Sequence, residues 1–172
     1  MSYADFVREY QNMVYTTSLR ITGDVHDAED IAQEVFLKAY LRFSDLQTHE
    51  NPGGWLRTAA RNLSINHIVR YRRKFLFIHP DDTFGEQNAF IDDPDESDEW
   101  LYEKTGQIKN ALLELPASYR VPLVLYYYEN LEYKEIAKKL KVSLSKVKTD
   151  ILRGKKKMKS SIQKMESADA KQ

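Results

Sequence analysis

Residues 27–41, DAEDIAQEVFLKAYL, combine four carboxylates with an apolar repeat that could form one face of a helix. Because a helix turns by about 100° per residue, a second face remains once the apolar stripe is buried. That second face carries acids and leucines together, and it could dock on a basic, partly apolar partner. Its members are Asp30, Gln33, Glu34, Leu37 and Leu41.

Phe36 lies at the edge of the opposite, core-facing stripe, between the two faces. A plainer interpretation of the second face is that Leu37 and Leu41 meet the first helix inside a small bundle. The sequence leaves both interpretations open. The core-facing stripe consists of Ala28, Ile31, Ala32, Val35, Phe36 and Ala39.

Residues 53–75 contain no acid and interleave aromatic with basic side chains. Cations bind a phosphate backbone and aromatic rings stack on unpaired bases, so this mixture suits single-stranded or locally melted nucleic acid. Asn62 and Asn66 lie four apart on one helical face, and each amide can pair with a base edge. The alternative is that Trp55, Leu63 and Ile68 are simply core. The aromatic and basic residues are Trp55, Tyr71 and Phe75 with Arg57, Arg61, Arg70, Arg72, Arg73 and Lys74.

Residues 132–162 have the pattern of two helices separated by a short turn, which is helix-turn-helix spacing. Ser143 is placed to cap the second helix, whose outward hydroxyl and cationic side chains could reach base edges and phosphates. A solvated lysine-rich helix is the plainer alternative. The docking side is predicted to hold Leu144, Val147, Ile151 and Met158, and the outward side Ser145, Lys148, Thr149, Arg153 and Lys156.

Two residues depart from the usual pattern of such a unit. Lys141 stands in the turn, where glycine is usual. Asp150 lies near the predicted DNA side, although it could instead pair with Lys146 one turn earlier.

Helices must position these groups, because apolar residues recur at helical spacing through most of the chain and strand patterns are scarce. We expect an all-α protein of two small helical domains joined by a flexible acidic linker. The expected division is 1–78 for the first domain, 79–99 for the linker, 100–165 for the second domain and 166–172 for a tail. Helices are predicted at 3–21, 26–43, 55–74, 100–115 and 117–128 and twice within 132–162, with Pro52, Gly53 and Gly54 breaking the pattern.

The formal net charge of zero conceals a segregation of charge along the chain. It is −5 over residues 1–50, +6 over 51–79, −9 over 80–104 and +8 over 105–172. Two basic blocks could therefore bind a polyanion, and two acidic blocks something else.

Composition and motifs exclude several classes of protein. The absence of cysteine rules out disulfides and thiolate metal sites and fits a reducing cytoplasm. No apolar run is long enough to enter a membrane as a span. We expect no metal, cofactor or enzymatic activity, since no nucleophile and base pair or phosphate loop occurs. His49, His67 and His79 are isolated, and a metal site is disfavoured at His26, Glu29, Asp30 and Glu34, where Glu29 points away from the other acids.

Four motifs occur in order, DAEDIAQEVFLKAY, WLRTAARNLSIN, ALLELPASYR and YKEIAKKLKVSLSKVKT. Together they resemble the extracytoplasmic-function (ECF) sigma factors of bacterial RNA polymerase, over nearly the whole chain apart from the linker and tail. The resemblance implies a region 2 domain that melts and reads the promoter −10 element, and a region 4 helix-turn-helix domain that reads the −35 element. It also implies docking on the polymerase core (the β′ clamp helices and the β subunit). Many members are held inactive by an anti-sigma factor, which could keep this chain at the inner membrane face.

Carried over position by position, the resemblance implies three sets of contacts. Loop 43–54 matches the segment that captures a flipped base, and Asp150 stands where relatives often carry arginine. The implied polymerase contacts are Asp30, Gln33, Glu34 and Phe36; the implied −10 contacts are Asn62 and Asn66; and the implied −35 contacts are Ser145, Lys146, Lys148, Thr149 and Arg153. From the helix faces themselves we add Leu37 to the polymerase contacts, Trp55, Arg61 and Arg70 to the −10 contacts, and Lys156 to the −35 contacts.

The sequence also permits other interpretations of the linker and of the function. The acidic linker could mimic RNA in the exit path of the polymerase or serve only as a solubilising spacer. The rival function is an ordinary helix-turn-helix regulator with an N-terminal helical interaction domain and no polymerase contact. Such a regulator needs neither an acid-free aromatic helix nor an acidic docking face, and a helical scaffold would leave the basic blocks unexplained.

Overall fold

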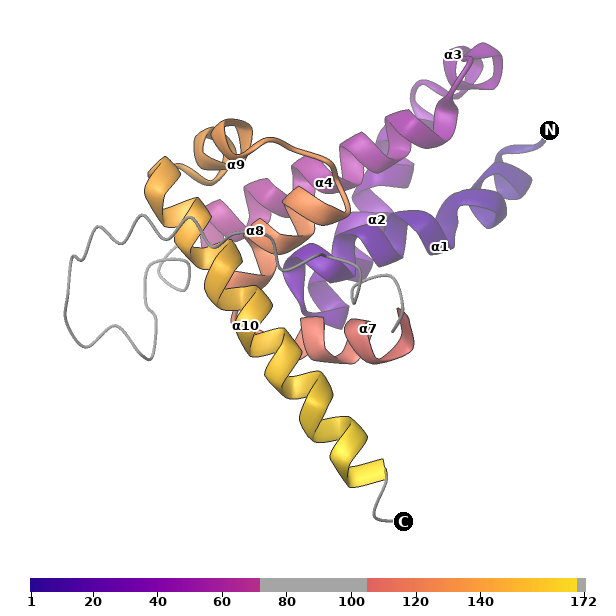
Figure 1. Ribbon diagram of the computed structural model, residues 1–172. Helices are drawn as coiled ribbons and strands as arrows, with labels where there is room; N and C mark the ends of the chain where they lie inside the picture. The colour runs from indigo at the N-terminus through magenta and orange to yellow at the C-terminus, as the bar shows by residue number, and fades with distance from the viewer. Residues whose placement is uncertain (72–104, 170–172) are drawn as a thin grey trace.

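The computed structural model describes residues 1–71 and 105–169, and the regular elements in those ranges are all α-helices, as predicted (Figure 1). The predicted linker, 79–99, lies outside the described residues. The N-terminal half, residues 1–71, contains α1 (Tyr3–Thr22), α2 (Val25–Tyr40), α3 (Phe43–Thr48) and α4 (Pro52–Tyr71). The C-terminal half, residues 105–169, contains α7 (Thr105–Glu114), α8 (Ala117–Tyr127), α9 (Tyr133–Leu140) and α10 (Leu144–Asp169).

Helices α1 and α2 form a hairpin with capped ends. At the start of α1, Ser2 and Asp5 form a capping box, and the hydrogen bonds from Ser2 hold the pKa of Asp5 below its ordinary value. At the other end, Gly23 adopts a left-handed conformation with φ of 68°. Asp24 then caps α2 by accepting a hydrogen bond from the Asp27 backbone at 3.0 Å. The two residues between the helices, Gly23 and Asp24, therefore suffice to turn α2 back onto α1.

The core of the N-terminal half lies where α1, α2 and α4 pack together. Ala28, Val35 and Ala39 are fully buried and Ile31 is nearly so, which confirms the predicted core-facing stripe of α2. The cluster consists of Phe6, Val14, Ile31, Val35, Ala39, Leu46, Leu56 and Ala60.

The core of the C-terminal half extends into the N-terminal half. Helix α10 packs against α7, α8 and α9, and α8 packs against α1. Ile21 of α1 and Ile65 and Ile68 of α4 are buried in the same cluster as the core residues of α7 to α10. Each half has an interior of its own, and apolar side chains also join the two halves. In Figure 1, α8 of the C-terminal half lies beside α1 of the N-terminal half.

Arg120 of α8 is a buried cation that joins the two halves. Its Nη2 donates to the Thr22 carbonyl at 2.9 Å and its Nη1 to the Leu115 carbonyl at 2.6 Å. Both carbonyls stand at helix C-terminal ends, where acceptors lack intrahelical partners and the helix dipole favours a positive charge. A β-carbon added at Gly23 would overlap Nη2 of Arg120, so a larger residue there would be strained by its conformation and would displace the guanidinium.

The segment 43–54 differs from the predicted loop and break. It contains α3, and α4 begins at Pro52 instead of about residue 55, while α2 ends at Tyr40. The Asn51 side chain accepts a hydrogen bond from the Gly54 backbone at 2.8 Å and so caps α4. Proline at the first helical position loses nothing by lacking an N–H, because that group would have no helical partner. Pro52 therefore starts the helix, and the two glycines lie in its first turn.

We expect Gly23→Ala to lower the free energy of unfolding by about 2 to 3 kcal/mol, because it combines a left-handed alanine with a clash against Arg120. Urea denaturation of the full chain measures this. In an Arg120→Ala background the clash is absent, so the same change should cost less there. Equal costs in both backgrounds would contradict the assigned contact.

Candidate nucleic-acid and polymerase interfaces

The second face of α2 is exposed, as the sequence predicted. Asp30, Gln33 and Glu34 lie at the surface, and Leu37 and Leu41 are 68% and 83% exposed. The interpretation that these leucines meet the first helix is therefore wrong. Large apolar side chains left exposed among acids are typical of a docking surface, and we call these five residues the α2 face.

Two aromatic residues border the α2 face. Tyr40 is 63% exposed and was not singled out from the sequence; its ring meets the edge of Tyr3 with 5.0 Å between centroids. Phe36 is half-buried against the N-terminal core, and its carbonyl accepts a hydrogen bond from the Tyr3 hydroxyl. Phe36 thus lies at the edge of the core, and a contact between Phe36 and a partner stays a prediction.

Helix α4 exposes one end of its polar side more than the other. Asn66 and Arg70 are exposed, whereas Arg61 and Asn62 are half-buried. Tyr71 is 63% exposed and the Arg70 guanidinium lies 5.3 Å from its ring centroid. This end of α4 presents a cation and an aromatic ring together, the combination that binds single strands.

Trp55 lies near the start of α4 and belongs with the core more than with the surface. It is half-buried and packs, with Leu63, against the N-terminal core. Ile68 is fully buried. The packing supports the core interpretation of these three residues, and a −10 contact by Trp55 stays a prediction.

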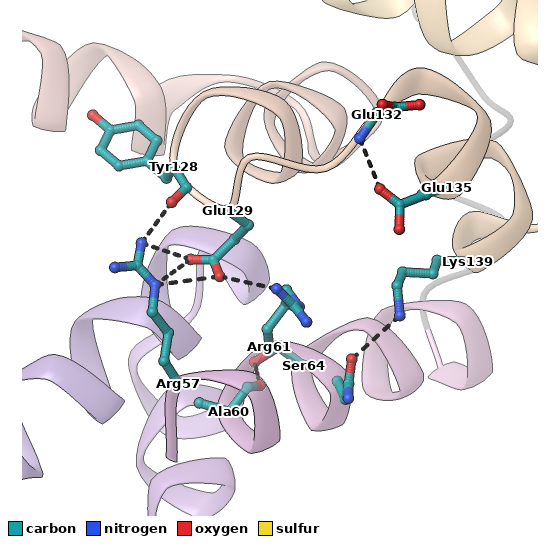
Figure 2. A network of polar contacts seen from close by, with 10 residues as sticks. Arg57, Ala60, Arg61, Ser64, Tyr128, Glu129, Glu132, Glu135 and Lys139 are labelled. Atoms are coloured by element: carbon teal, nitrogen blue, oxygen red, sulfur yellow. Dashed lines mark hydrogen bonds and ion pairs between the residues drawn. The ribbon is translucent and has the colours of Figure 1, made fainter. Parts of the chain in front are cut away.

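Glu129, in the turn after α8, binds two arginines of α4 (Figure 2). Its carboxylate is 2% exposed and accepts from Arg57 Nη2 at 3.1 Å and from Arg57 Nε at 3.2 Å. Arg57 Nη2 also donates to the Tyr128 carbonyl at 2.5 Å. Arg61 Nη1 lies farther from the same carboxylate, at 3.7 Å. We call this arrangement the Glu129 clamp; it was not predicted from the sequence.

Two further polar contacts involve α4. Lys139 Nζ of α9 lies 3.4 Å from Asn62 Oδ1, so the first helix of the helix-turn-helix unit contacts a predicted −10 residue. His67 was predicted to be isolated, and this is wrong. Its Nε2 lies 3.1 Å from Asp27 Oδ2, because packing of α4 on α2 joins residues that are far apart in sequence.

Helices α9 and α10 form the predicted helix-turn-helix unit. Ser143 accepts a hydrogen bond from the Lys146 backbone at 3.1 Å, which confirms it as the cap of α10. Val147, Ile151 and Met158 are buried, but Leu144 is 36% exposed and contributes less to docking than predicted. The predicted outward residues are exposed except for the half-buried Thr149; they are Ser145, Lys148, Thr149, Arg153 and Lys156.

The two unusual residues of this unit have local explanations. Lys141 ends α9 in the left-handed conformation that glycine normally supplies, with φ of 57°. Asp150 is buried, and its carboxylate lies 3.0 Å from Lys146 Nζ. Of the two roles considered for Asp150, pairing with Lys146 is therefore the one observed. Asp150 therefore holds Lys146 against α10 instead of facing DNA itself, and Lys146 is the least available of the predicted −35 cations.

Neither a metal site nor a membrane span is found in the described part of the chain. No three of the described histidine, aspartate and glutamate side chains gather to hold a metal ion. No helix within residues 1–71 and 105–169 is long and apolar enough to cross a membrane.

Comparisons with known proteins match both halves. Residues 6–74 match the family model of sigma-70 region 2, and residues 105–158 match that of sigma-70, region 4. Among solved structures, the sigma factor RpoE of Bartonella quintana, in complex with the anti-sigma factor NepR, is similar over 94% of this chain and 96% of its own, with 17% identity and a TM-score of 0.48.

Two curated relatives from Bacillus subtilis cover most of the chain. The ECF RNA polymerase sigma factor SigW is 31% identical over 159 residues, which are 89% of this chain and 84% of SigW. The ECF RNA polymerase sigma factor SigM is 32% identical over 161 residues, which are 92% of this chain and 94% of SigM. The chain therefore belongs to the family of ECF RNA polymerase sigma factors.

Proposed function

We propose that this protein binds the RNA polymerase core, directs it to specific promoters and starts transcription there. Membership of the ECF sigma factor family supports this function. The observation that carries the mechanism is the α2 face, where Leu37 and Leu41 are exposed beside Asp30 and Glu34. A basic, partly apolar surface on the polymerase would bury these leucines and pair with these acids.

The other two surfaces would then contact the promoter. In this proposal the polar side of α4 binds the melted −10 strand through Asn62, Asn66, Arg61 and Arg70, with Trp55 at its base. The first turns of α10 bind the −35 duplex in the major groove. The division into domains 1–78 and 100–165 is part of the proposal, as is a linker of 79–99.

The proposal extends to regulation and location, for which the same family membership is the support. The proposal includes an anti-sigma factor that holds the chain inactive, and a site of action in the cytoplasm, where the polymerase is. Attachment at the inner membrane face would come from that factor. The rival reading, a helix-turn-helix regulator with no polymerase contact, is not favoured, because the N-terminal half matches sigma-70 region 2.

The test of the function is initiation itself. The purified chain is mixed with bacterial core polymerase and genomic DNA, and the 5′ ends of the transcripts are mapped. We expect starts that share an upstream sequence and are absent with core alone. Starts indistinguishable from those of core alone would refute the proposal.

Glu34→Arg should weaken binding to core polymerase by about tenfold or more, because it places a cation on the α2 face opposite a basic partner. Fluorescence anisotropy of labelled chain titrated with core measures the affinity. Glu29→Arg is the matched control, with the same charge change on an exposed residue of α2 that points away from Glu34. Equal affinities of the two variants would show that the α2 face does not contact the core.

Lys148→Ala combined with Arg153→Ala should weaken binding to −35 duplex DNA roughly thirtyfold or more, since each lost contact to DNA is worth about 1 to 3 kcal/mol. Core binding should stay unchanged. The matched control is Lys138→Ala with Lys164→Ala, which removes two exposed lysines elsewhere on α9 and α10. The duplex DNA is taken from the mapped promoters. Similar losses of affinity in the two double variants would mean that the first turns of α10 do not read the −35 duplex.

A further inference from the structure

Two of the three described arginines of α4 are bound by the C-terminal half. Arg57 and Arg61 contact Glu129, while Arg70 lies at the exposed end of α4. These arginines belong to the block 51–79, which carries net charge +6 and no acid of its own. The anion that neutralises them therefore comes from the other half of the chain.

The geometry of the Glu129 clamp is that of an anion bound by a guanidinium fork. Both Nε and Nη2 of Arg57 lie within 3.2 Å of Glu129 Oε1, and Oε2 lies 3.3 Å from Nε. Arginine binds carboxylates and phosphates with this same fork. The carboxylate of Glu129 thus occupies a position that suits a backbone phosphate.

The clamp lies within a larger cover over α4. Lys139 contacts Asn62, one of the two amides that could pair with a base edge. Ile65 and Ile68 on the same helix are buried in the C-terminal core cluster. Only 17% of the Arg61 side chain is exposed. The C-terminal half therefore restricts the access of a nucleic-acid strand to Arg61 and Asn62.

The polar contacts between the C-terminal half and α4 leave a hydrogen-bonding group without a partner in the described part of the chain. Arg61 lies 3.7 Å from the Glu129 carboxylate, and its Nε is buried without a hydrogen-bond partner among the described residues. Arg57 keeps 43% of its side chain exposed. A buried donor without a partner costs free energy, so this contact is weaker than its burial suggests. Polar contacts of this kind are typical of interfaces between domains that move relative to one another.

From these contacts we infer that the C-terminal half is an intramolecular competitor of nucleic acid: Glu129 holds Arg57 and Arg61 in the place of a backbone phosphate and must leave before a strand binds α4. The inference rests on the proposed function, because it assumes that α4 binds a melted strand. It adds a closed state, in which the chain blocks part of its own −10 surface, at Arg61 and Asn62, without another protein.

The test is the affinity of the free full-length chain for a mixed-sequence, 20-nucleotide single-stranded DNA, measured by fluorescence anisotropy without polymerase. Glu129→Gln keeps the shape of the side chain but removes the charge that holds the arginines. If the closed state is about 90% populated, this variant should bind about tenfold more tightly. The matched control, Glu114→Gln, removes the same charge from an exposed site whose partner, the Ser161 hydroxyl, can also bond an amide. It should leave the affinity nearly unchanged.

A second variant separates closure from net charge and from folding. The Arg20 guanidinium lies 4.4 Å from the ring centroid of Tyr128, across the same interface. Tyr128→Ala removes this cation–π contact without changing charge, and it should also raise the affinity for the single strand. Thermal melting followed by circular dichroism identifies any variant that fails to fold. The affinity of the variant that does fold then tests the inference.

Affinities of folded Glu129→Gln and Tyr128→Ala equal to that of Glu114→Gln would overturn the inference, as would the absence of binding by every variant. Failure of the proposed function is a separate observation, since it would appear as a lack of promoter-dependent starts with core polymerase. Tighter binding by the opened variants supports the closed state whichever promoter the chain reads.

Discussion

The carboxylate of Glu129 is 2% exposed, and a charge removed from water this completely must be paired. Its partners are arginines that precede it by about seventy residues, so the pairing fixes the position of one half of the chain on the other. Because those arginines lie on α4, a helix that has no acid of its own, pairing with the buried acid also neutralises part of that helix. One ion-pair network thus contributes both to the arrangement of the halves and to the availability of α4.

Arg120 has the opposite charge and a different kind of partner. Its Nη1 and Nη2 donate to backbone carbonyls at the ends of α7 and α1. Gly23 leaves room for it, and Ile21, Ile65 and Ile68 add apolar contacts nearby. The interface therefore has one region held by neutral acceptors and apolar packing, and another held by charges that a polyanion could also satisfy.

Local patterns in the sequence predicted most of what local contacts determine. The stripe of α2, the Ser143 cap and the pair of Lys146 with Asp150 all join residues within a few positions of one another. The Asn51 cap is also local, but the Pro-Gly-Gly sequence concealed it. Contacts between distant residues left no periodic signal, and the clamp was missed for this reason. One signal could have indicated it: Arg120 and Glu129 stand alone at the two ends of an apolar run, and lone charges near a core need partners.

The two regions of the interface differ in what a nucleic-acid strand could replace. A phosphate that takes the place of the Glu129 carboxylate leaves Arg57 with the same kind of charged acceptor, so the arginine loses little on exchange. Glu129 becomes hydrated when it leaves, which offsets the cost of its burial. No strand supplies a carbonyl for Arg120 or an apolar surface for Ile65 and Ile68. Nucleic acid can therefore compete directly for the charged region, whereas separation of the apolar region needs binding energy from other surfaces, such as the α2 face.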